Sequence, residues 1–326
     1  MFENKNVLVT GGTGMVGREL VQLLLDRGAK VRVASLDEPV DFFDDVEFHK
    51  VDLTIYKNCE LVCEGMDYIF HVAGIKCSAE MPRIKPLNYF LPMIRFNTNM
   101  MEAAYQSGTK WFLYTSSVGV YAPAEVMVED DVWKTFPSDN DKLPGWTKRI
   151  GELQAEGYKI QYDWDNISIV RPANIYGKWD EFDKETAMVI PSLIRKAEEA
   201  GKGGTMSVWG DGTPIRDFVS AHDVARGMLF VVENKITKPV NLASGDGVTI
   251  EKIATSIASR FGCNIEFDSS KPNGDHKRVL DMSRMFSYGF ENIIDIEAGI
   301  DDMISWYLDN KNKKDNLNFR YNSFKV

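Results

Sequence analysis

The feature that most constrains the fold is a glycine-rich loop close to the first residue. The segment "NVLVTGGTGMVG" places an apolar, β-branched run before Gly11, Gly14 and Gly17, and an amphipathic helical pattern follows these glycines. Glycines at this spacing permit a tight turn and a close approach of backbone to ligand, while the following helix offers free N–H groups and a positive dipole end to a diphosphate. The loop therefore predicts a dinucleotide site at the start of a βαβ unit.

Strand-like and helix-like segments alternate through the first half of the chain. The predicted strands are 6–10, 30–35, 46–52, 67–74, 111–117 and 167–172. The predicted helices are 15–28, 93–108 and one whose opening turns are 142–152 and which continues to 162. Strands that alternate with amphipathic helices imply right-handed crossovers and a parallel sheet covered on both faces. We therefore expect an α/β fold, a Rossmann-type doubly wound parallel sheet with a smaller, mixed α/β substrate-binding lobe.

The rhythm of the sequence loosens after residue 171, where short strands, helices and Gly-rich turns follow one another. The segments 222–234 and 239–244 look like one more helix and strand that return to the main sheet. We expect residues 1–171 and about 216–245 to form the dinucleotide-binding domain, and about 172–215 and 246–326 to form the smaller, substrate-binding lobe.

Charge and composition exclude several classes of function. A net charge of -10 argues against a nucleic-acid partner. No apolar run approaches the roughly 20 residues needed to cross a bilayer, and the first residues are too polar for a signal peptide, so we expect a cytoplasmic protein without a membrane partner. The four cysteines lack the spacing of a disulfide framework or a zinc site, and we expect no bound metal.

The ends of the next strands supply further candidates for cofactor contact. Asp52 and Leu53 close the third strand, where a carboxylate accepts a hydrogen bond from an adenine amino group, and the small residues Ala73 and Gly74 end the fourth. Asp37 follows the second strand, and a carboxylate near the ribose 2′-hydroxyl favours NAD over NADP, although NADP is not excluded. The residues expected to contact the cofactor here are Gly11, Thr13, Gly14, Met15, Gly17, Asp37, Asp52, Leu53, Ala73 and Gly74.

Seven segments in order carry a resemblance to a known family. They are "TGGTGMVG", "YTSSVGVY", "TKRIGE", "VRPANIYG", "VIPSLIRK", "WGDGTPIRDFVSAHDVARG" and "HKRVLDMSR". Over nearly its whole length the chain resembles the extended short-chain dehydrogenase/reductase superfamily, which contains the nucleotide-sugar epimerases, dehydratases and reductases. Within it the chain is similar to GDP-fucose synthase-like and sugar 4-epimerase-like proteins.

The resemblance implies a catalytic set with one member missing. In the family a Ser or Thr, a Tyr and a Lys act on the sugar hydroxyl while the nicotinamide takes or returns hydride. Ser117 matches the serine and Lys148 matches the lysine of Tyr-x-x-x-Lys, but the tyrosine position holds Pro144, which has no proton to give. Tyr121 or Tyr176, Ser117 with a water, or Lys148 itself at a lowered pKa are the alternative proton donors.

Two more departures narrow the reaction that the resemblance implies. The Cys and His that perform the C3 and C5 epimerisations in GDP-fucose synthases are replaced by Val118 or Gly119 and by Met188. The Asp-Glu pair of the dehydratases is missing from "SSVGVY". Double epimerisation and 4,6-dehydration are therefore disfavoured, which leaves epimerisation, reduction or oxidation at C4.

The substrate side of the resemblance rests on two arginines and two asparagines. Arg216 and Arg278 match positions that clamp the substrate diphosphate, a task that suits a guanidinium fork, although either is alternatively a surface ion pair. Asn174 matches a residue that binds the sugar or diphosphate. Asn97 matches the asparagine that supports the lysine through a water. The resemblance implies that both Asn97 and Lys148 belong to the cofactor-binding residues. Either asparagine is alternatively a buried amide satisfied by backbone.

The sequence thus favours an NAD(P)-dependent nucleotide-sugar oxidoreductase or epimerase acting at C4 of an NDP-hexose, with GDP as a candidate base. The alternative is a protein of the same fold that binds the cofactor and sugar nucleotide with lost or rerouted catalysis. Segments 94–106 and 147–162 would be neighbouring helices, and such a pair forms a four-helix interface in this family, so we expect a homodimer.

Overall fold

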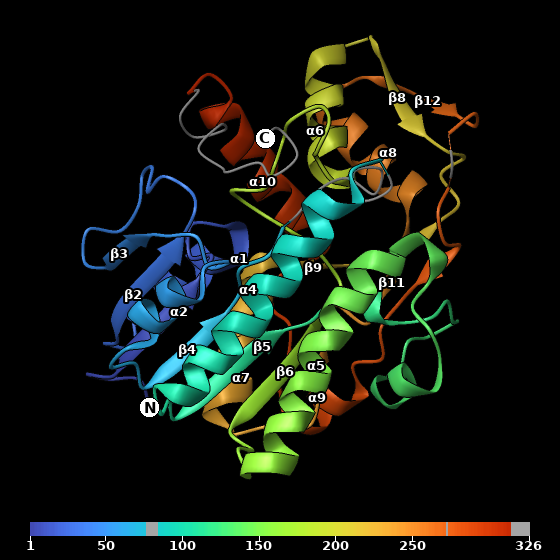
Figure 1. Cartoon of the computed structure of the whole chain (residues 1–326). Helices are drawn as coiled ribbons and strands as arrows, with labels where there is room; N and C mark the ends of the chain where they lie inside the picture. The colour runs from blue at the N-terminus through green and yellow to red at the C-terminus, as the bar shows by residue number, and fades with distance from the viewer. Residues whose placement is uncertain (76–83, 272, 314–326) are drawn as a thin grey trace.

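A parallel seven-stranded sheet lies at the centre of the structure, a computed structural model that describes residues 1–75, 84–271 and 273–313 (Figure 1). In spatial order the strands are β10 (Val240–Leu242), β6 (Ile167–Pro172), β5 (Trp111–Thr115), β4 (Tyr68–His71), β1 (Asn6–Thr10), β2 (Lys30–Ser35) and β3 (Glu47–Lys50). Every neighbouring pair runs parallel. This arrangement confirms the predicted Rossmann-type α/β fold.

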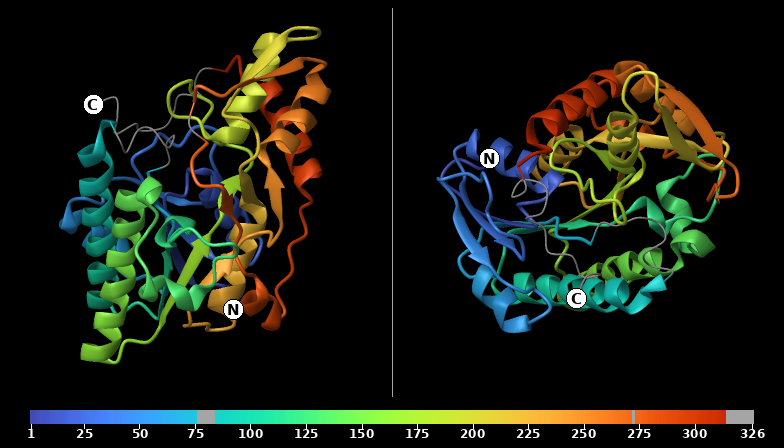
Figure 2. Two further views of the ribbon diagram at one scale, coloured as in Figure 1. Left: turned by 90° about the vertical axis from the view of Figure 1, so that its right-hand side faces the viewer. Right: turned by 90° about the horizontal axis from the view of Figure 1, so that it is seen from above.

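Helices cover both faces of this sheet. Helices α1 (Met15–Leu25) and α7 (Ala221–Glu233) pack on one face, and α2 (Tyr56–Cys63), α4 (Pro86–Gln106) and α5 (Lys142–Tyr162) pack on the other. The view from above in Figure 2 shows the sheet between these two layers. Successive side chains of β1 alternate between the two cores, because neighbouring residues of a strand point to opposite faces. Both faces are apolar, as a buried parallel sheet requires.

Helix α4 begins earlier than the sequence pattern predicts, at Pro86 rather than near residue 93. Helix α5 begins at Lys142, as the segment 142–152 predicts. A proline is tolerated in the first turn of a helix, because the first N–H groups have no partner within the helix. Pro144 therefore lies in the first turn of α5, on the same helix as Lys148.

A smaller lobe lies above the carboxyl edge of the sheet (Figure 1) and has a hydrophobic core of its own. Strand β9 (Ile215–Ser220) pairs with β7 (Asn174–Tyr176), β11 (Gly247–Thr249) and β13 (Lys277–Arg278), and β8 (Thr205–Trp209) pairs with β12 (Asn264–Asp268). The lobe's helices are α6 (Val189–Ala200), α8 (Ile250–Phe261) and α10 (Ile296–Asn310). Helix α9 (Ser283–Ser287) lies lower, where Met285 packs in the same core as β10 of the main sheet.

The segments predicted to return to the main sheet, 222–234 and 239–244, form α7 and β10. Strand β10 pairs with β6 of that sheet. The division of the chain into two domains stays a prediction, and β9, at its proposed edge, pairs within the lobe. Among the described helices, none has the length and apolar character that a membrane span requires.

Candidate active site

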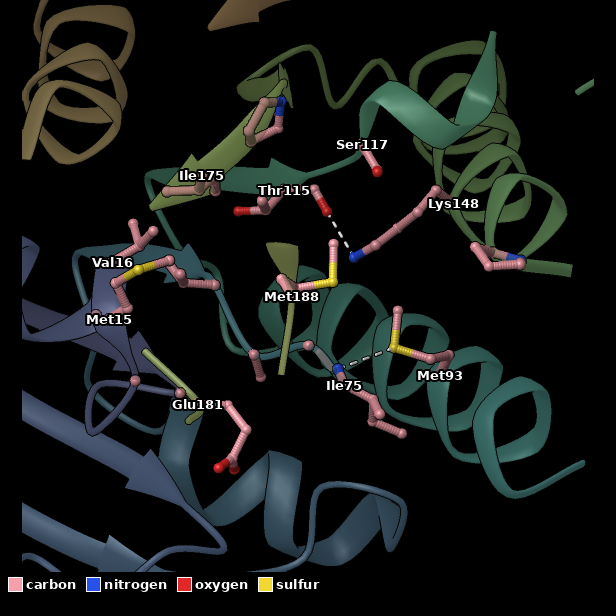
Figure 3. Close-up of a pocket in the computed structure, with 18 of the residues that line it drawn as sticks. Met15, Val16, Ile75, Met93, Thr115, Ser117, Lys148, Ile175, Glu181 and Met188 are labelled. Carbon is pink, nitrogen blue, oxygen red and sulfur yellow. Dashed lines mark hydrogen bonds between the residues drawn. The ribbon is translucent and has the colours of Figure 1, made fainter. Parts of the chain in front are cut away.

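A cleft of about 610 Å³ opens at the carboxyl ends of the sheet strands, between the sheet and the smaller lobe (Figure 3). In α/β folds of this kind ligands bind outside the carboxyl ends of the strands. The predicted site residues that line the cleft are Gly11, Gly14, Met15, Gly17, Asp37, Asp52, Leu53, Ala73, Gly74, Ser117, Lys148, Asn174 and Arg278. Thr13, Asn97 and Arg216 do not line it. The fold therefore brings most of the predicted residues to one place.

The glycine loop forms a cradle that only glycine permits at two positions. Gly11 has φ +67°, and a Cβ there would lie 2.8 Å from the Cα of Ala73. A Cβ on Gly17 would lie 2.2 Å from the carbonyl oxygen of Gly11. Helix α1 starts at Met15, and the N–H groups of its first turn have no partner within the helix. Backbone N–H groups, a bare backbone surface and a helix N-terminus suit a diphosphate, so the loop fits a dinucleotide.

The predicted ribose reader is held in place by a neighbour from the loop. The Thr13 hydroxyl donates to Asp37 Oδ2 at 2.7 Å and lies 2.7 Å from the Ser35 hydroxyl. Thr13 is fully buried and does not line the cleft. Its hydroxyl holds the Asp37 carboxylate from behind. This arrangement fixes a carboxylate at the rim of the cleft, where it favours a ribose hydroxyl over a phosphate.

The Asn97 side chain contacts His71 rather than Lys148. His71 Nε2 lies 2.9 Å from Asn97 Oδ1, and His71 Nδ1 lies 2.8 Å from the Thr10 hydroxyl. Burial and the nearby charge of Lys148 lower the pKa of His71 to about 3, so its ring is neutral. Asn97 Nδ2 is buried and has no hydrogen-bond partner among the described residues. The predicted water-mediated support of Lys148 by Asn97 stays a prediction.

Lys148 is buried beside the end of β5. Its ammonium donates to the carbonyl oxygen of Thr115 at 2.8 Å. Burial lowers the pKa of Lys148 to about 7, against the opposing negative charge of Glu152. An amine with this pKa exchanges protons readily at neutral pH. The structure thus supports the expectation that desolvation makes Lys148 a titrating group.

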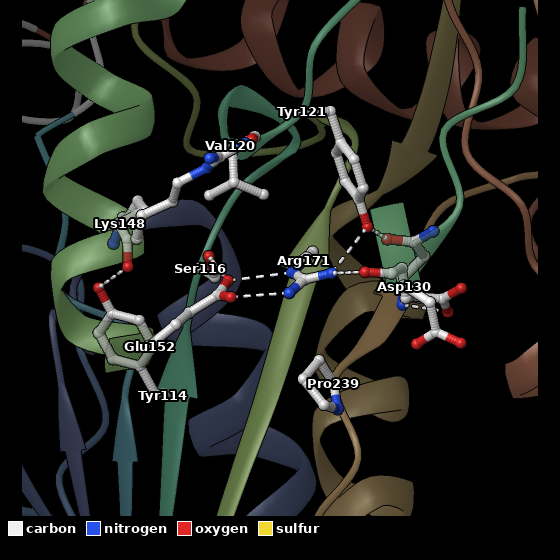
Figure 4. A network of polar contacts seen from close by, with 12 residues as sticks. Tyr114, Ser116, Val120, Tyr121, Asp130, Lys148, Glu152, Arg171 and Pro239 are labelled. Atoms are coloured by element: carbon white, nitrogen blue, oxygen red, sulfur yellow. Dashed lines mark hydrogen bonds and ion pairs between the residues drawn. The ribbon is translucent and has the colours of Figure 1, made fainter. Parts of the chain in front are cut away.

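Below Lys148, a buried network fixes α5 against the sheet (Figure 4). Glu152 accepts from the Ser116 hydroxyl at 2.5 Å and from Arg171 Nη2 at 2.7 Å. Arg171 also donates to the carbonyl oxygen of Glu129 at 2.8 Å. Both members of the Arg171–Glu152 pair are almost completely buried. The pair therefore locks the helix that carries Lys148 to strand β6.

Pro144 lines the cleft from α5, and Ser117 lines it from the end of β5. Ser117 Oγ accepts a hydrogen bond from the Gly119 N–H at 3.1 Å, and its hydroxyl proton is left for another acceptor. The Pro144 carbonyl oxygen accepts from the Thr147 hydroxyl at 2.7 Å. The wall of the cleft at the predicted tyrosine position is therefore a proline ring.

The two substitute tyrosines are packed rings. The Tyr121 hydroxyl donates to Asn241 Oδ1 at 2.6 Å, outside the cleft lining, and burial raises its pKa. Tyr176 lines the cleft, but its hydroxyl lies against Gly299, where an added Cβ would approach it to 2.2 Å. Burial raises the pKa of Tyr176 as well. Neither ring has the lowered pKa that an acid or base for a sugar hydroxyl needs.

The two predicted clamp arginines are direct neighbours on adjacent strands. Arg278 of β13 is in register with Arg216 of β9. Burial and the Arg278 charge lower the pKa of Arg216 to about 10. Arg278 Nη2 lies 2.5 Å from both Asp141 Oδ2 and Asp275 Oδ2. Two guanidinium groups side by side at a cleft wall, one of them lining it, suit an anionic ligand.

Sequence reasoning missed Asp141, which lines the cleft between these groups. It is the N-cap residue of α5, with Pro144 and Lys148 following on the same helix. Residues spaced by three and seven lie on one face of a helix, so this spacing was the signal that could have found it. The described residues contain no group of three or more His, Cys, Asp or Glu side chains able to hold a metal ion.

Residues 7–243 match the model of the NAD dependent epimerase/dehydratase family. A GDP-L-fucose synthase of Sinorhizobium fredii is 28% identical over 307 residues, which cover 92% of this chain and 94% of that protein. In structure the chain is similar to a UDP-N-acetylglucosamine 4-epimerase of Methanobrevibacter ruminantium in complex with UDP-N-acetylmuramic acid (TM-score 0.84, 22% identity, 94% of this chain and 99% of that one). A GDP-L-fucose synthetase of Naegleria fowleri bound to NADP has a TM-score of 0.80 at 22% identity and covers 96% of this chain and 97% of its own.

Proposed function

This chain belongs to the NAD dependent epimerase/dehydratase family, and we propose that it is an NAD(P)-dependent enzyme that acts on a nucleoside-diphosphate hexose. The proposed reaction is hydride transfer at C4 of the sugar, and the relative from S. fredii favours a GDP-linked substrate. One observation carries the proposal: a single cleft joins the glycine cradle, the desolvated Lys148 and Arg278. These are the parts that hold a dinucleotide, exchange protons and neutralise a second diphosphate.

The proposed roles follow the positions in the cleft. The loop from Gly11 to Gly17 holds the cofactor diphosphate, and the bound nicotinamide would take up or return the hydride. Asp37 supports NAD as the cofactor, with NADP remaining possible in a family in which one structural relative binds it. Ser117 holds the sugar oxygen and Lys148 takes part in proton exchange. Arg278, with Arg216 beside it, binds the substrate diphosphate.

The second candidate function, a binding protein without turnover, is favoured by Pro144 alone. Its ring replaces the expected acid and lines the cleft. The buried Lys148 counts against this candidate, because placing a lysine in a dry site is costly and its lowered pKa suits proton exchange. The enzyme is therefore the better supported proposal.

A homodimer is part of the proposal. Helices α4 and α5 lie side by side on one face of the molecule (Figure 1). They expose large apolar side chains, namely Leu87, Leu91, Leu153 and Ile160. Such side chains suit a self-complementary interface between two copies. Light scattering of the purified protein at several concentrations tests this, and we propose a cytoplasmic location for the dimer.

The test of the function is the near-ultraviolet absorbance of the protein loaded with NAD, as GDP-, UDP-, dTDP- and CDP-hexoses are added one at a time. Reduced nicotinamide is expected with one of them. If none reduces the cofactor, 4-keto sugar nucleotides are added to the protein loaded with NADH or NADPH, and the absorbance is expected to fall. Silence in both directions, with calorimetry showing that a sugar nucleotide binds, would favour the binding protein.

Lysine-to-methionine variants supply a matched pair for this assay. Lys148→Met removes the buried ammonium, whereas Lys142→Met removes an exposed one from the first turn of the same helix. Only the Lys148 variant is expected to lose hydride transfer. Equal activity of the two variants would contradict the role given to Lys148.

A further inference from the structure

The carboxyl group of Asp141 occupies the wall of the cleft next to the place that Pro144 leaves without a proton donor. Asp141, Pro144 and Lys148 follow at intervals of three and four residues from the N-cap of α5, and all three line the cleft. Side chains at this spacing lie along one face of a helix. Asp141 is therefore an ionisable group on the face from which the family's tyrosine would act.

Asp141 also lies beside the serine expected to hold the sugar oxygen. A Cβ placed on Gly119 would be 3.6 Å from Ser117 Oγ and 3.7 Å from Asp141 Cγ. The hydroxyl and the carboxyl group thus flank the same small residue. A ligand oxygen bound beside Gly119 would therefore lie close to both the Ser117 hydroxyl and the Asp141 carboxyl group.

The charges around Asp141 come from three elements. Arg278 on β13 forms an ion pair with it, Asp275 precedes that strand and shares the same guanidinium, and Arg216 on β9 lies next to Arg278. Lys148 lies further along α5. Burial raises the pKa of Asp141, and the charge of Asp275 adds to this, although Arg278 and Arg216 oppose it.

The two carboxylates that share Arg278 behave differently. Burial also opposes the ionisation of Asp275, but Arg278 and the donors of Asn140 and Ser138 outweigh it and lower the pKa of Asp275. Among the residues that the structure describes, Asp141 has Arg278 as a donor but no set comparable to that of Asp275. Asp275 is thus the anchor of the guanidinium, and Asp141 is the carboxyl group that gains a proton more easily.

We propose that Asp141 is the catalytic acid and base of this site and takes the part that Pro144 cannot play. This proposal rests on the proposed function. In reduction, hydride passes from the bound nicotinamide to C4 of a keto sugar while the Asp141 carboxyl group gives its proton to the C4 oxygen, leaving a carboxylate, a hydroxyl and oxidised cofactor. In oxidation, the Asp141 carboxylate accepts the hydroxyl proton as hydride leaves C4 for the oxidised nicotinamide.

Substrate binding would itself prepare this acid. A substrate diphosphate is an anion that competes with Asp141 for Arg278. Once the guanidinium turns to the diphosphate, Asp141 loses its ion pair while it stays buried. Burial without a neighbouring cation favours the protonated carboxyl group. Binding of a 4-keto sugar nucleotide should therefore be accompanied by uptake of a proton, measurable by calorimetry in buffers of different ionisation enthalpy.

The test compares Asp141→Asn with Asp139→Asn, whose side chain is exposed in the same 3₁₀ turn and does not line the cleft. A general acid contributes on the order of 100-fold or more, so Asp141→Asn should lower kcat by about that factor, while the Kd of the sugar nucleotide stays within about threefold. Asp139→Asn should match the unaltered protein. Asp141→Asn should also abolish the proton uptake on binding.

Two further variants make the test specific. Asp141→Glu should keep more activity than Asp141→Asn, because it retains a carboxyl group. Adding Pro144→Tyr to Asp141→Asn should restore turnover by at least about tenfold, since it supplies the acid from the family's usual position.

The outcomes separate the two proposals. If the unaltered protein transfers no hydride with any sugar nucleotide, the proposed function fails. If it does, and Asp141→Asn retains kcat within about threefold, Asp141 is not the acid and the inference is overturned. Loss of both turnover and sugar-nucleotide binding in Asp141→Asn and Asp141→Glu would also overturn it, since Asp141 would then act only by holding Arg278.

Discussion

Replacing Lys148 by methionine should make the protein more stable while it destroys turnover. The ordinary pKa of a lysine is 10.5, and burial lowers that of Lys148 to about 7. The folded protein thus binds this proton more weakly than the unfolded chain does. Below pH 7 the ammonium is charged in both states, and the full cost of burying it is present. Between about 7 and 10.5 the folded protein has lost the proton while the unfolded chain keeps it, so this cost shrinks as the pH rises.

The size of the effect follows from the pKa difference. At 1.36 kcal/mol per pKa unit, a fall from 10.5 to about 7 corresponds to about 5 kcal/mol. Methionine has a similar length but loses the hydrogen bond to the Thr115 carbonyl oxygen, which offsets about 1 kcal/mol. Below pH 7 we therefore expect Lys148→Met to raise the free energy of unfolding by a few kcal/mol, with about 4 as the upper bound.

Guanidinium unfolding followed by circular dichroism measures this difference, with Lys142→Met as the control. Lys142 is exposed in the first turn of α5, so its variant should stay within about 0.5 kcal/mol of the unaltered protein. The gain of Lys148→Met should diminish as the pH approaches 10.5. A Lys148→Met protein that is no more stable below pH 7, or whose gain does not change with pH, would refute the reasoning that Lys148 is a desolvated cation.

Three further predictions concern the surroundings of the site. Glu152→Leu leaves the buried Arg171 guanidinium without its carboxylate and should cost about 3–5 kcal/mol in guanidinium unfolding, whereas a loss below about 1 would contradict the buried pair. Gly145→Ala places a Cβ 2.2 Å from the carbonyl oxygen of Gly119; it should lower the unfolding free energy by about 1–3 kcal/mol, and an unchanged value would show that the contact relaxes freely. Asp37→Ser removes a carboxylate from the cleft rim and should weaken NAD while strengthening NADP, with a change in the ratio of their Kd values of about tenfold expected from calorimetry and an unchanged ratio ruling out Asp37 as the ribose reader.

The central sheet was predictable because its signals are local. Most of its strands are short apolar or alternating runs, although β3 at the edge has no fully buried residue. The glycines of the loop are needed by contacts that a Cβ would block, so the sequence pattern and the packing agree there. The start of α4 was not predictable from periodicity. Its first turn carries a proline and few regular apolar positions, and tertiary contacts decide where the helix begins.

The residues of the candidate site likewise fall into those that short motifs predict and one that they do not. Ser117 and Lys148 were found from short motifs, and both line the cleft. Asp141 escaped notice because the only mark in its own segment is its spacing from Pro144 and Lys148 on α5. The role proposed for Asp141 depends on its ion pair with Arg278. Arg278 is distant in the sequence, and the strand that carries it, β13, is held in place by pairing with β9. Long-range ion pairs of this kind have no signature in a single sequence.

The two ionisable groups on α5 bear directly on the choice between an enzyme and a binding protein. The environment lowers the pKa of Lys148 and raises that of Asp141, so both are moved toward neutrality from opposite sides. Each shift makes the charged form less favourable in the folded protein, which costs stability, and a site that only binds anions would gain more from a fully charged lysine and no carboxylate. Groups in a cleft whose pKa values are shifted toward neutral pH are typical of sites of acid and base catalysis. The proline therefore replaces one residue of the family's set in a cleft whose electrostatics still favour proton transfer.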